Sequence, residues 1–415
     1  MSGPLAGVRV LDLSRVLAGP FCTMILGDLG AEVIKIERPE GGDDTREWGP
    51  PFASGESAYY LCVNRNKKSV ALDLKSPKGI EAVRAISARS DVVIENFRVG
   101  GADKLGLGYE TLAVGNPGLV YCSITGYGQT GPYRDLPGYD FIAQAMSGLM
   151  SVTGEESGEP MKLGVATVDL TTGMYAAVAI LAALRRRDST GVGQRIDLAL
   201  MDSALSWLAN VGENYLVSAE VPGRFGNGHA TIVPYQVFRS KDGYLAVGIG
   251  NDRQYRKFCG TAGVPELSSD ERFSTNPERV RNREALIPLL ERVFVTRPTE
   301  EWIELFWSEG IPAGPINTVD RALEDPNTIA REMVVEMPHP KAGSVRLIGS
   351  PMKFSATPVE YRRPPPLLGE HTEEVLRDVL GMPAAEIREL VGTPEPPTQE
   401  PGRSWNSPRT GTDMG

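Results

Sequence analysis

The sequence has few of the residues that bind metals or form disulfides. Only four of its 415 residues are cysteine and only three are histidine, and both kinds are scattered along the chain. No CxxC pair, HExxH motif or Cys/His cluster occurs, so we predict neither a metal site nor a disulfide framework. Reduced, mostly buried thiols are typical of a reducing compartment, and we expect this protein in the cytoplasm.

Long apolar segments and basic clusters are also missing. The longest apolar run covers residues 174–184, which is too short to cross a bilayer, and we expect no signal peptide. The net charge is −10, from 43 Lys and Arg against 53 Asp and Glu. The basic triplet at residues 185–187 is better explained as the end of a helix. We therefore expect no membrane partner and no nucleic-acid partner.

Three common fingerprints of nucleotide-binding and hydrolytic enzymes are absent as well. The segment SRVLAGP follows the first predicted strand, at the place where a dinucleotide-binding protein carries GxGxxG. No GxxxxGK[ST] loop and no GxSxG elbow occur. An NAD-dependent oxidoreductase, a P-loop nucleotidase and an α/β-hydrolase are therefore disfavoured.

What the chain does contain is an alternation of strands and helices. Hydrophobic residues make up 41% and charged residues 23%, as in ordinary soluble proteins. Short β-branched runs predict strands at residues 8–13, 32–36, 69–72, 91–95, 119–124 and 195–200. Helices are predicted at residues 21–29, 77–87, 170–187, 202–216 and 371–380. This order indicates βαβ units, and hence an α/β fold with a parallel sheet.

The composition changes in the second half of the chain. Residues 254–323 are mostly helical and more charged, and they follow a predicted hairpin at 237–248. We assign 1–200 to a large domain, 201–330 to a linker and small domain, and 331–395 to a return to the large domain. The segment 396–415 is rich in Pro, Thr, Ser and Gly, and we predict a disordered tail there.

Patterns alone single out three candidate functional features. Asp169 stands at the start of a predicted helix and is either an N-cap or a carboxylate nucleophile. In both cases the helix dipole and free N–H groups are expected to keep it ionised. Arg38 follows the second predicted strand and either binds a phosphate or forms a surface salt bridge with Glu37 or Glu40. The segment 226–229 is either a lid or an ordinary loop.

Several longer stretches together resemble one family. They are LAGVRVLDLSRVLAGPFCTMILGDLGAEVIKIERPEGGDDTR, NRNKKSVALDLKSPKG, DVVIENFRVG, GYGQTGPY, YDFIAQAMSG, VDLTTGMYAA, GVGQRIDLALMDSAL and LGEHTEEVL. Each motif is weak by itself, but their order and spacing over residues 5–380 resemble the class III CoA transferases, typified by formyl-CoA transferase and the carnitine CoA transferases.

The resemblance implies a fold and an activity. The family fold is an interlocked homodimer, in which each chain has a Rossmann-like large domain and a smaller α/β domain. Its members move CoA from an acyl-CoA donor to a carboxylic acid through an aspartyl anhydride and an aspartyl-CoA thioester. The nucleophile corresponds to Asp169. CoA is a substrate, so the resemblance implies no bound cofactor; the expected partners are an acyl-CoA, a small carboxylic acid and a second copy of the chain.

The resemblance also implies contact residues. Arg38 would face the CoA phosphates, residues 72–75 would lie along the adenosine, and residues 137–140 would flank the pantetheine and the thioester. The full set is Leu17, Ala18, Arg38, Leu72, Asp73, Leu74, Lys75, Asn96, Phe97, Arg98, Lys104, Pro137, Gly138, Tyr139 and Asp140.

A loop near the middle of the chain bears on the substrates. Gly226, Asn227, Gly228 and His229 resemble the family's substrate loop, without the run of glycines of formyl-CoA transferase, which argues against formate and oxalate. The surrounding sequence is more similar to members that act on succinyl-CoA and a second dicarboxylate such as glutarate. His229 would help to recognise the distal carboxylate of such a dicarboxylate substrate.

Two alternatives remain open at this stage. An α-methylacyl-CoA racemase has the same fold but needs a histidine as an acid/base group. Tyr139 stands where that histidine would be. A CoA-binding protein without catalysis is the second alternative, and retention of Asp169 at a helix start argues against it.

Overall fold

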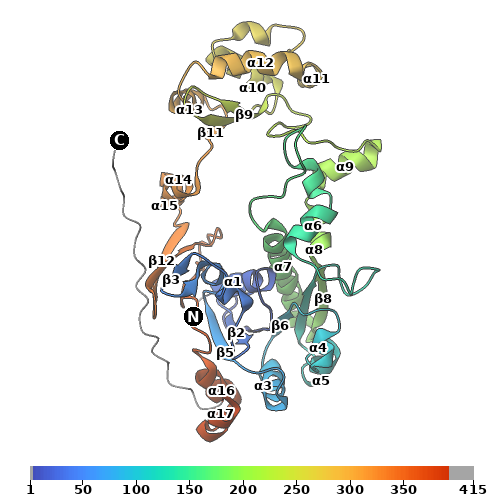
Figure 1. Ribbon diagram of the computed structural model, residues 1–415, viewed down its shortest axis with the longest axis vertical. Helices are drawn as coiled ribbons and strands as arrows, with labels where there is room; N and C mark the ends of the chain where they lie inside the picture. Colours follow the sequence, from blue (N-terminus) through green and yellow to red (C-terminus); the bar gives the residue numbers. More distant parts are fainter. Residues whose placement is uncertain (1–2, 392–415) are drawn as a thin grey trace, which may run out of the picture.

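A six-stranded parallel sheet forms the centre of the larger part of the molecule (Figure 1). The computed structural model describes residues 3–391, so the predicted tail at 396–415 lies outside the described residues. The strands are β1 (Arg9–Asp12), β2 (Glu32–Glu37), β5 (Lys67–Ala71), β6 (Val92–Glu95), β7 (Val120–Thr125) and β8 (Gln194–Ala199). All six predicted strands are confirmed, with ends shifted by one or two residues.

The order of the strands decides where a ligand can bind. The sheet runs β5-β2-β1-β6-β7-β8, and every neighbouring pair is parallel. The chain moves outward from β1 in one direction and then returns to β6 and moves in the other. This is the Rossmann order, whose switch point lies between β1 and β6. Ligands bind outside the carboxyl ends of the strands at this point.

Helices cover both faces of the sheet. One face packs against α1 (Ala18–Asp28) and α7 (Thr167–Thr190). The other packs against α3 (Pro77–Ser87), α5 (Tyr109–Gly115), α16 (Thr372–Leu380) and α17 (Ala384–Val391). Val10 faces the first core and Leu11 the second. Burial on both faces explains why the central strands β6 and β7 are mostly apolar, whereas β2, β5 and β8 also carry several charged or polar residues.

Shorter elements complete the large domain. They are η1 (Asp44–Arg46), β3 (Phe52–Ala53), β4 (Glu56–Ser57), α2 (Ala58–Leu61), α4 (Gly101–Lys104), α6 (Asp140–Met146), η2 (Leu149–Val152) and α8 (Leu200–Ser206). A hairpin of β12 (Val334–His339) and β13 (Gly343–Ile348) packs on Leu61 through Met337, Val345 and Leu347. The last part of the chain therefore packs against its beginning.

Three helices differ from the sequence-based expectation. Helix α1 begins at Ala18, three residues before its predicted start at 21. The helix predicted at 202–216 is two helices, α8 and α9 (Ala209–Ser218). Ala209 has a φ of 39°, which an α-helix does not accommodate, so the hydrogen-bond ladder breaks there. Helix α7 begins three residues before its predicted start, at Thr167, and this places Asp169 inside its first turn.

The smaller domain has its own core. Strands β9 (Tyr235–Arg239), β10 (Tyr244–Gly248) and β11 (Ala313–Pro315) form an antiparallel sheet, which confirms the predicted hairpin. Its helical elements are α10 (Asp252–Thr261), η3 (Pro265–Ser268), α11 (Asn276–Arg281), α12 (Arg283–Phe294) and α13 (Thr299–Ser308). Phe238 stacks on Phe294 at the centre, with 4.4 Å between ring centroids. Figure 1 shows this domain joined to the large one on one side through α9 and on the other through α14 (Val319–Glu324) and α15 (Pro326–Ala330).

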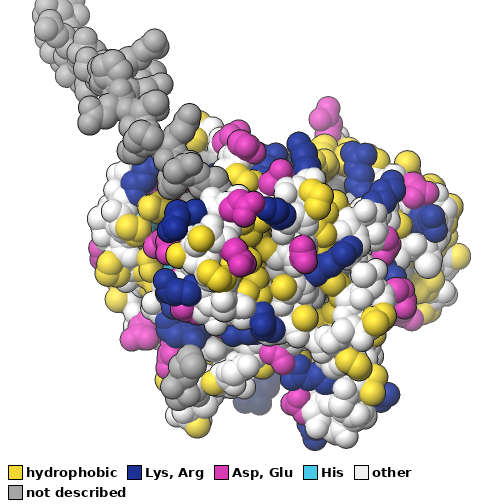
Figure 2. All heavy atoms as spheres, turned by 90° about the horizontal axis from the view of Figure 1, so that it is seen from below, with side chains coloured by type: hydrophobic (Ala, Val, Ile, Leu, Met, Phe, Trp, Pro, Cys, Tyr) yellow, Lys and Arg dark blue, Asp and Glu magenta, His cyan; other side chains and the backbone are white. Residues whose placement is uncertain are grey.

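Within the described residues, α7 is the one helix that is long and apolar enough to span a membrane by length and composition. Half of its most apolar window is buried within the fold, where Ala176 and Ile180 belong to the core beneath the sheet. A core helix of a large domain meets the same criterion. The face seen in Figure 2 carries Lys and Arg side chains interspersed with Asp and Glu, without a continuous basic patch.

Candidate active site

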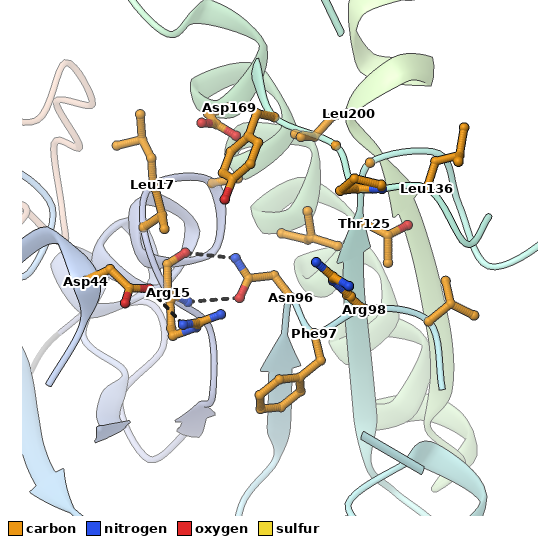
Figure 3. Close-up of a pocket in the computed structure, with 18 of the residues that line it drawn as sticks. Arg15, Leu17, Asp44, Asn96, Phe97, Arg98, Thr125, Leu136, Asp169 and Leu200 are labelled. Carbon is orange, nitrogen blue, oxygen red and sulfur yellow. Dashed lines mark hydrogen bonds and ion pairs between the residues drawn. The ribbon is translucent and has the colours of Figure 1, made fainter. Parts of the chain in front are cut away.

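A cavity of about 500 Å³ opens at the switch point of the sheet (Figure 3). Its walls come from the segments that follow β1, β6 and β7, from the loop before α6, and from the first turn of α7. Of the predicted contact residues, it brings together Leu17, Ala18, Asn96, Phe97, Arg98, Pro137, Gly138, Tyr139 and Asp169. These residues span more than 150 positions of sequence.

The position of Asp169 differs from the N-cap interpretation. The N-cap of α7 is Ala166, and Asp169 lies three positions further along, still in the first turn. The capping group is the carboxylate of Asp140, whose Oδ1 accepts hydrogen bonds from Val168 N at 2.8 Å and Asp169 N at 3.2 Å. Asp169 therefore does not cap the helix, and its own carboxylate remains available to the cavity.

The electrostatic expectation for Asp169 is also wrong. Burial, with a further contribution from the nearby charge of Asp140, raises the pKa of Asp169 to about 7. The N–H groups of the first turn that would have favoured the ionised form bond to Asp140 instead. An unusually basic carboxylate in a cavity is typical of functional sites.

Close contact between two helices sets the place of Asp169. A Cβ placed on Gly173 would lie 2.6 Å from the carbonyl oxygen of Ala18, so any larger residue would push α7 away from α1. Gly173 thus allows the start of α1 to lie directly beside the first turn of α7. The glycine of the VDLTTG motif is explained by this contact.

A second close approach shapes the opposite wall. A Cβ on Gly126, at the end of β7, would lie 2.7 Å from the Cα of Gly138. The loop before α6 therefore crosses the end of β7 backbone against backbone. This contact places Pro137 and Tyr139 at the cavity and explains the first glycine of the GYGQTGPY motif.

A smaller cavity of about 180 Å³ adjoins the first one. Its lining includes the predicted contacts Arg38, Leu72, Asp73, Leu74 and Lys75. Arg15 and Phe97 line both cavities, so the two form one continuous surface that crosses the carboxyl ends of the strands. An elongated molecule could lie across it, with one end near Asp169 and the other near Arg38.

Arg38 pairs with a residue that sequence reasoning did not consider. Its Nη2 lies 2.7 Å from Asp44 Oδ1, and its Nε donates to Gly42 O at 2.9 Å. The expected salt bridge is thus present, but its partner is neither Glu37 nor Glu40. Asp44 Oδ2 also binds Arg15 Nη1 at 2.7 Å. The side chain of Arg98 forms no ion pair or hydrogen bond with any of residues 3–391. Its guanidinium lies at the cavity (Figure 3).

Several predicted residues lie elsewhere. Lys104 is exposed on α4 and lines neither cavity, and the half-buried Asp140 caps α7. The segment 226–229 lies apart from both cavities: Gly226 N donates to Gly154 O, and His229 N donates to Tyr235 O. The ring of His229 accepts a hydrogen bond from Thr231 N at its Nδ1. Within one chain, the loop does not reach Asp169.

Sequence reasoning missed other residues of the cavity wall. They are Arg15, Val16, Asp44, Trp48, Val99, Ile124, Thr125, Gly126, Arg134, Asp135, Leu136 and Leu200. The position of Thr125 and Gly126 at the carboxyl end of β7 could have indicated them, because carboxyl ends of parallel strands share one edge. Trp48 lies in an irregular segment and packs edge-on against Tyr59, and no strand-based rule points to it. Burial and nearby charges, Asp169 among them, raise the pKa of Tyr59 to about 12.

No group of three or more His, Cys, Asp or Glu side chains suited to a metal ion occurs in residues 3–391. Among the same residues, none of the three histidines lines the Asp169 cavity. The side chains that do line it are three carboxylates, three guanidinium groups, an amide, two hydroxyl groups and apolar groups. They suit an acyl group attached to a phosphate-bearing carrier.

The comparison with known proteins agrees with this geometry. The sequence profile of CoA-transferase family III matches residues 5–372. The chain belongs to this family. It is therefore a CoA transferase with a Rossmann-like α/β fold. The missing histidine in the cavity is consistent with this assignment.

Relatives of this CoA transferase match it over most of their length. The succinyl-CoA:glutarate CoA-transferase of Homo sapiens is 47% identical over 388 residues, covering 94% of this chain and 89% of the relative. The succinate–glutarate CoA-transferase of Agrobacterium fabrum is 46% identical over 382 residues, with 91% and 96% covered. The crystal structure of a CAIB/BAIF family protein from Brucella suis matches with a TM-score of 0.83 at 45% identity, covering 91% of this chain and 100% of that one.

Proposed function

We propose that this CoA transferase moves CoA from succinyl-CoA to a dicarboxylic acid such as glutarate, with Asp169 as the covalent nucleophile. The observation that carries the proposal is the place of Asp169: on the wall of a cavity that continues, past Arg15 and Phe97, into the groove beside Arg38. The names of the two relatives described above support the choice of acids.

The reaction consists of four substitutions at carbonyl carbons. The Asp169 carboxylate attacks the thioester carbonyl of the donor, the C–S bond breaks, and a mixed anhydride and CoA thiolate form. The thiolate attacks the aspartyl carbonyl, which releases the donor acid and leaves aspartyl-CoA. The acceptor carboxylate attacks this thioester to form a second anhydride and CoA thiolate. The thiolate then attacks the acceptor's carbonyl, which forms the new acyl-CoA and regenerates Asp169. No water is consumed.

The electrostatics of the site suit these steps. A carboxylate with a pKa of about 7 is more nucleophilic, once ionised, than an ordinary aspartate. It is still ionised in half or more of the molecules at neutral pH and above. Arg38, Lys75 and Arg15 supply positive charge along the groove, where the CoA phosphates would lie.

We further propose that the enzyme works as a homodimer in the cytoplasm. Helix α9 has no buried residue, and Leu216 and Val217 on it are 76% and 79% exposed. Such exposed apolar side chains are typical of an interface. A second copy would also explain how the substrate loop at 226–229 could take part, since it does not reach Asp169 within its own chain. Light scattering of the purified protein tests the dimer.

A mass-spectrometric exchange assay tests the activity. Purified enzyme is mixed with succinyl-CoA and a panel of mono- and dicarboxylic acids that includes glutarate. We expect a new CoA ester from the native enzyme and none from Asp169→Ala. Asp188→Ala is the matched control, because Asp188 lies on the exposed far end of the same helix. Transfer by the Asp169→Ala variant would overturn Asp169 as nucleophile, and absence of glutaryl-CoA would overturn the choice of acceptor.

A further inference from the structure

The segment between β1 and α1, residues 14–18, forms a tight elbow with an unfavourable backbone conformation. Val16 at its centre has a φ of 70°, in the left-handed region. This region is strongly disfavoured for a β-branched residue. Such a conformation persists only where the surroundings over-determine it, and it is most common at functional sites.

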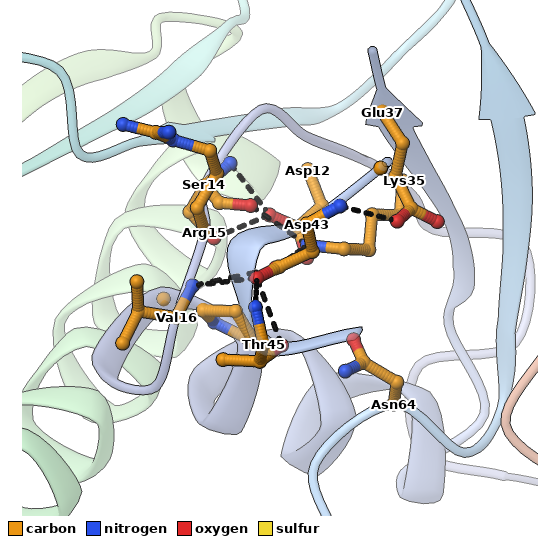
Figure 4. A network of polar contacts seen from close by, with 12 residues as sticks. Asp12, Ser14, Arg15, Val16, Lys35, Glu37, Asp43, Thr45 and Asn64 are labelled. Atoms are coloured by element: carbon orange, nitrogen blue, oxygen red, sulfur yellow. Dashed lines mark hydrogen bonds and ion pairs between the residues drawn. The ribbon is translucent and has the colours of Figure 1, made fainter. Parts of the chain in front are cut away.

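A buried ion pair holds the elbow (Figure 4). Lys35 Nζ and Asp43 Oδ2 are 2.8 Å apart, and both side chains are fully buried. Both oxygens of Asp43 lie 3.3 Å from the backbone nitrogen of Val16, which donates to them. Lys35 Nζ also donates to the carbonyl oxygen of Ser14 at 2.8 Å. The two charged groups thus bind the elbow on both sides of Arg15: Lys35 at the carbonyl of Ser14 and Asp43 at the N–H of Val16.

Further hydrogen bonds orient the Asp43 carboxylate and hold the backbone of Arg15. Thr45 donates to Asp43 Oδ1 through its N at 3.0 Å and its Oγ1 at 2.8 Å. Asn96, across the switch point, accepts from Arg15 N at 2.9 Å and donates to Arg15 O at 2.8 Å. Every residue from Ser14 to Val16 therefore has a backbone group bound by a side chain from another strand or loop.

This arrangement is poorly explained by stability alone. Removing a lysine and an aspartate from water carries a large desolvation penalty, and replacing buried ion pairs by apolar residues is often neutral or stabilising. The ionised forms are nevertheless favoured: Lys35 and the hydrogen bonds of Thr45 overcome the effect of burial and lower the pKa of Asp43 to about 2. The hydrogen bonds of the pair are directed at the elbow.

Two backbone donors at the end of the elbow are unpaired. The N–H groups of Leu17 and Ala18 have no hydrogen-bond partner within residues 3–391, because Leu17 is the N-cap and Ala18 the first residue of α1, where no preceding helical carbonyl is available. Both residues line the cavity that contains Asp169. Backbone N–H groups at a helix start are suited to stabilise the oxyanion of an acyl-transfer reaction.

We propose that Asp43 is a positioning residue, which holds Val16 in its strained conformation so that the N–H groups of Leu17 and Ala18 face the reacting carbonyl. The inference rests on the proposed function, since it takes Asp169 as the nucleophile. Asp43 itself does not touch the reacting atoms; it acts through the elbow.

The test compares two buried carboxylates at opposite ends of α1. Asp43→Asn removes the charge that pairs with Lys35 beside the elbow. Asp28→Asn is the matched control: Asp28 ends the same helix and pairs with the buried Arg65 at 2.6 Å, but it lies outside the two cavities. We expect Asp43→Asn to lower kcat at least about tenfold, as small misplacements of catalytic groups do, with KM for acyl-CoA changed less than about threefold. We expect Asp28→Asn to retain kcat within about twofold.

A second readout needs no substrate. Hydrogen exchange of the Val16 amide, which donates to Asp43, is followed by mass spectrometry, and we expect it to be faster in Asp43→Asn than in the native enzyme and in Asp28→Asn. A kcat of Asp43→Asn equal to that of Asp28→Asn would overturn the proposal. KM for acyl-CoA is measured as well, because Asp43 also lines the second cavity and its substitution there could change substrate binding instead of kcat. Transfer by Asp169→Ala would instead overturn the proposed function, whereas the exchange rates still decide whether Asp43 holds the elbow.

A milder variant covers the case that Asp43→Asn does not fold. Thr45→Val keeps the charge of Asp43 and the shape of the buried Thr45 side chain, but removes the hydrogen bond from Oγ1. We expect roughly a threefold to tenfold lower kcat with unchanged KM, because the carboxylate loses part of its orientation. An unchanged kcat in this variant would overturn the proposal as well.

Discussion

Asp140 accepts a hydrogen bond from the backbone N–H of Asp169, with 3.2 Å between Oδ1 and N. Its other oxygen accepts from Gln144 Nε2 at 2.6 Å, and Gln144 Oε1 in turn accepts from Leu163 N at 2.9 Å. One carboxylate thus caps the helix that carries the other and adds a negative charge beside it. The contact fixes the position of Asp169 and makes its carboxylate more basic.

The first prediction concerns the pH dependence of transfer. A pKa raised to about 7 means that Asp169 loses its proton, and becomes nucleophilic, as the pH rises through 7. We expect kcat/KM to rise over this range and then level off. Asp140→Asn removes the like charge, so the rising limb should move to lower pH by about one unit. Because burial is the larger cause of the shift, the limb should stay above the ordinary range of aspartate.

A pH–rate profile of the native enzyme and of Asp140→Asn checks this prediction. Asn keeps an oxygen that can accept from Val168 N, so the helix cap is retained while the charge is lost. Identical profiles would show that Asp140 has no electrostatic effect on the nucleophile.

The second prediction concerns the CoA groove. Arg38→Met should raise KM for acyl-CoA about tenfold and leave kcat nearly unchanged, since a charge-assisted hydrogen bond to a phosphate contributes about 1.5–3 kcal/mol and lies far from the reacting carbon. The effect should shrink as salt is added. Arg377→Met is the matched control, because Arg377 is also exposed and paired with a neighbouring carboxylate, that of Asp378. Steady-state kinetics at two salt concentrations test whether Arg38 binds the CoA phosphates. Equal KM values for acyl-CoA in Arg38→Met and Arg377→Met would argue against phosphates at Arg38.

The third prediction concerns the contact between α1 and α7. Gly173→Ala places a Cβ 2.6 Å from Ala18 O, so the helices must separate. We expect a loss of about 1–3 kcal/mol in the free energy of unfolding, as overpacked cores show, and a lower kcat because Asp169 moves away from Leu17.

Gly260→Ala provides the comparison for that variant. Gly260 lies in helix α10 of the small domain, and a Cβ there would meet no atom within 4 Å. Since alanine favours helices, we expect this variant to be equally or more stable, by up to about 1 kcal/mol. Thermal melts and kcat of both variants are measured together. Equal stability and activity would mean that the helix contact tolerates a methyl group.

Much of this protein was determined by its sequence. Runs of β-branched residues predicted the six strands of the large sheet, because such side chains favour the extended backbone of a strand. The order of several motifs indicated the family, and the profile match confirmed it. The alternation of strands and helices also implied a crevice at the carboxyl ends of the strands, where the cavity lies.

Other properties arose only from tertiary structure. Whether Asp169 caps its helix depends on Asp140, which is 29 positions away in sequence and is brought to the N–H groups by folding. Lys35 and Asp12 stand in two different strands, and only the register of β1 beside β2 places them together inside the protein. Folding likewise determines which residue pairs with Arg38. It also determines the conformation of the elbow at Val16 and the distance between the loop 226–229 and Asp169. Local sequence sets the period and propensity of each element, whereas the energies of charges and strained backbones depend on which groups folding brings close together.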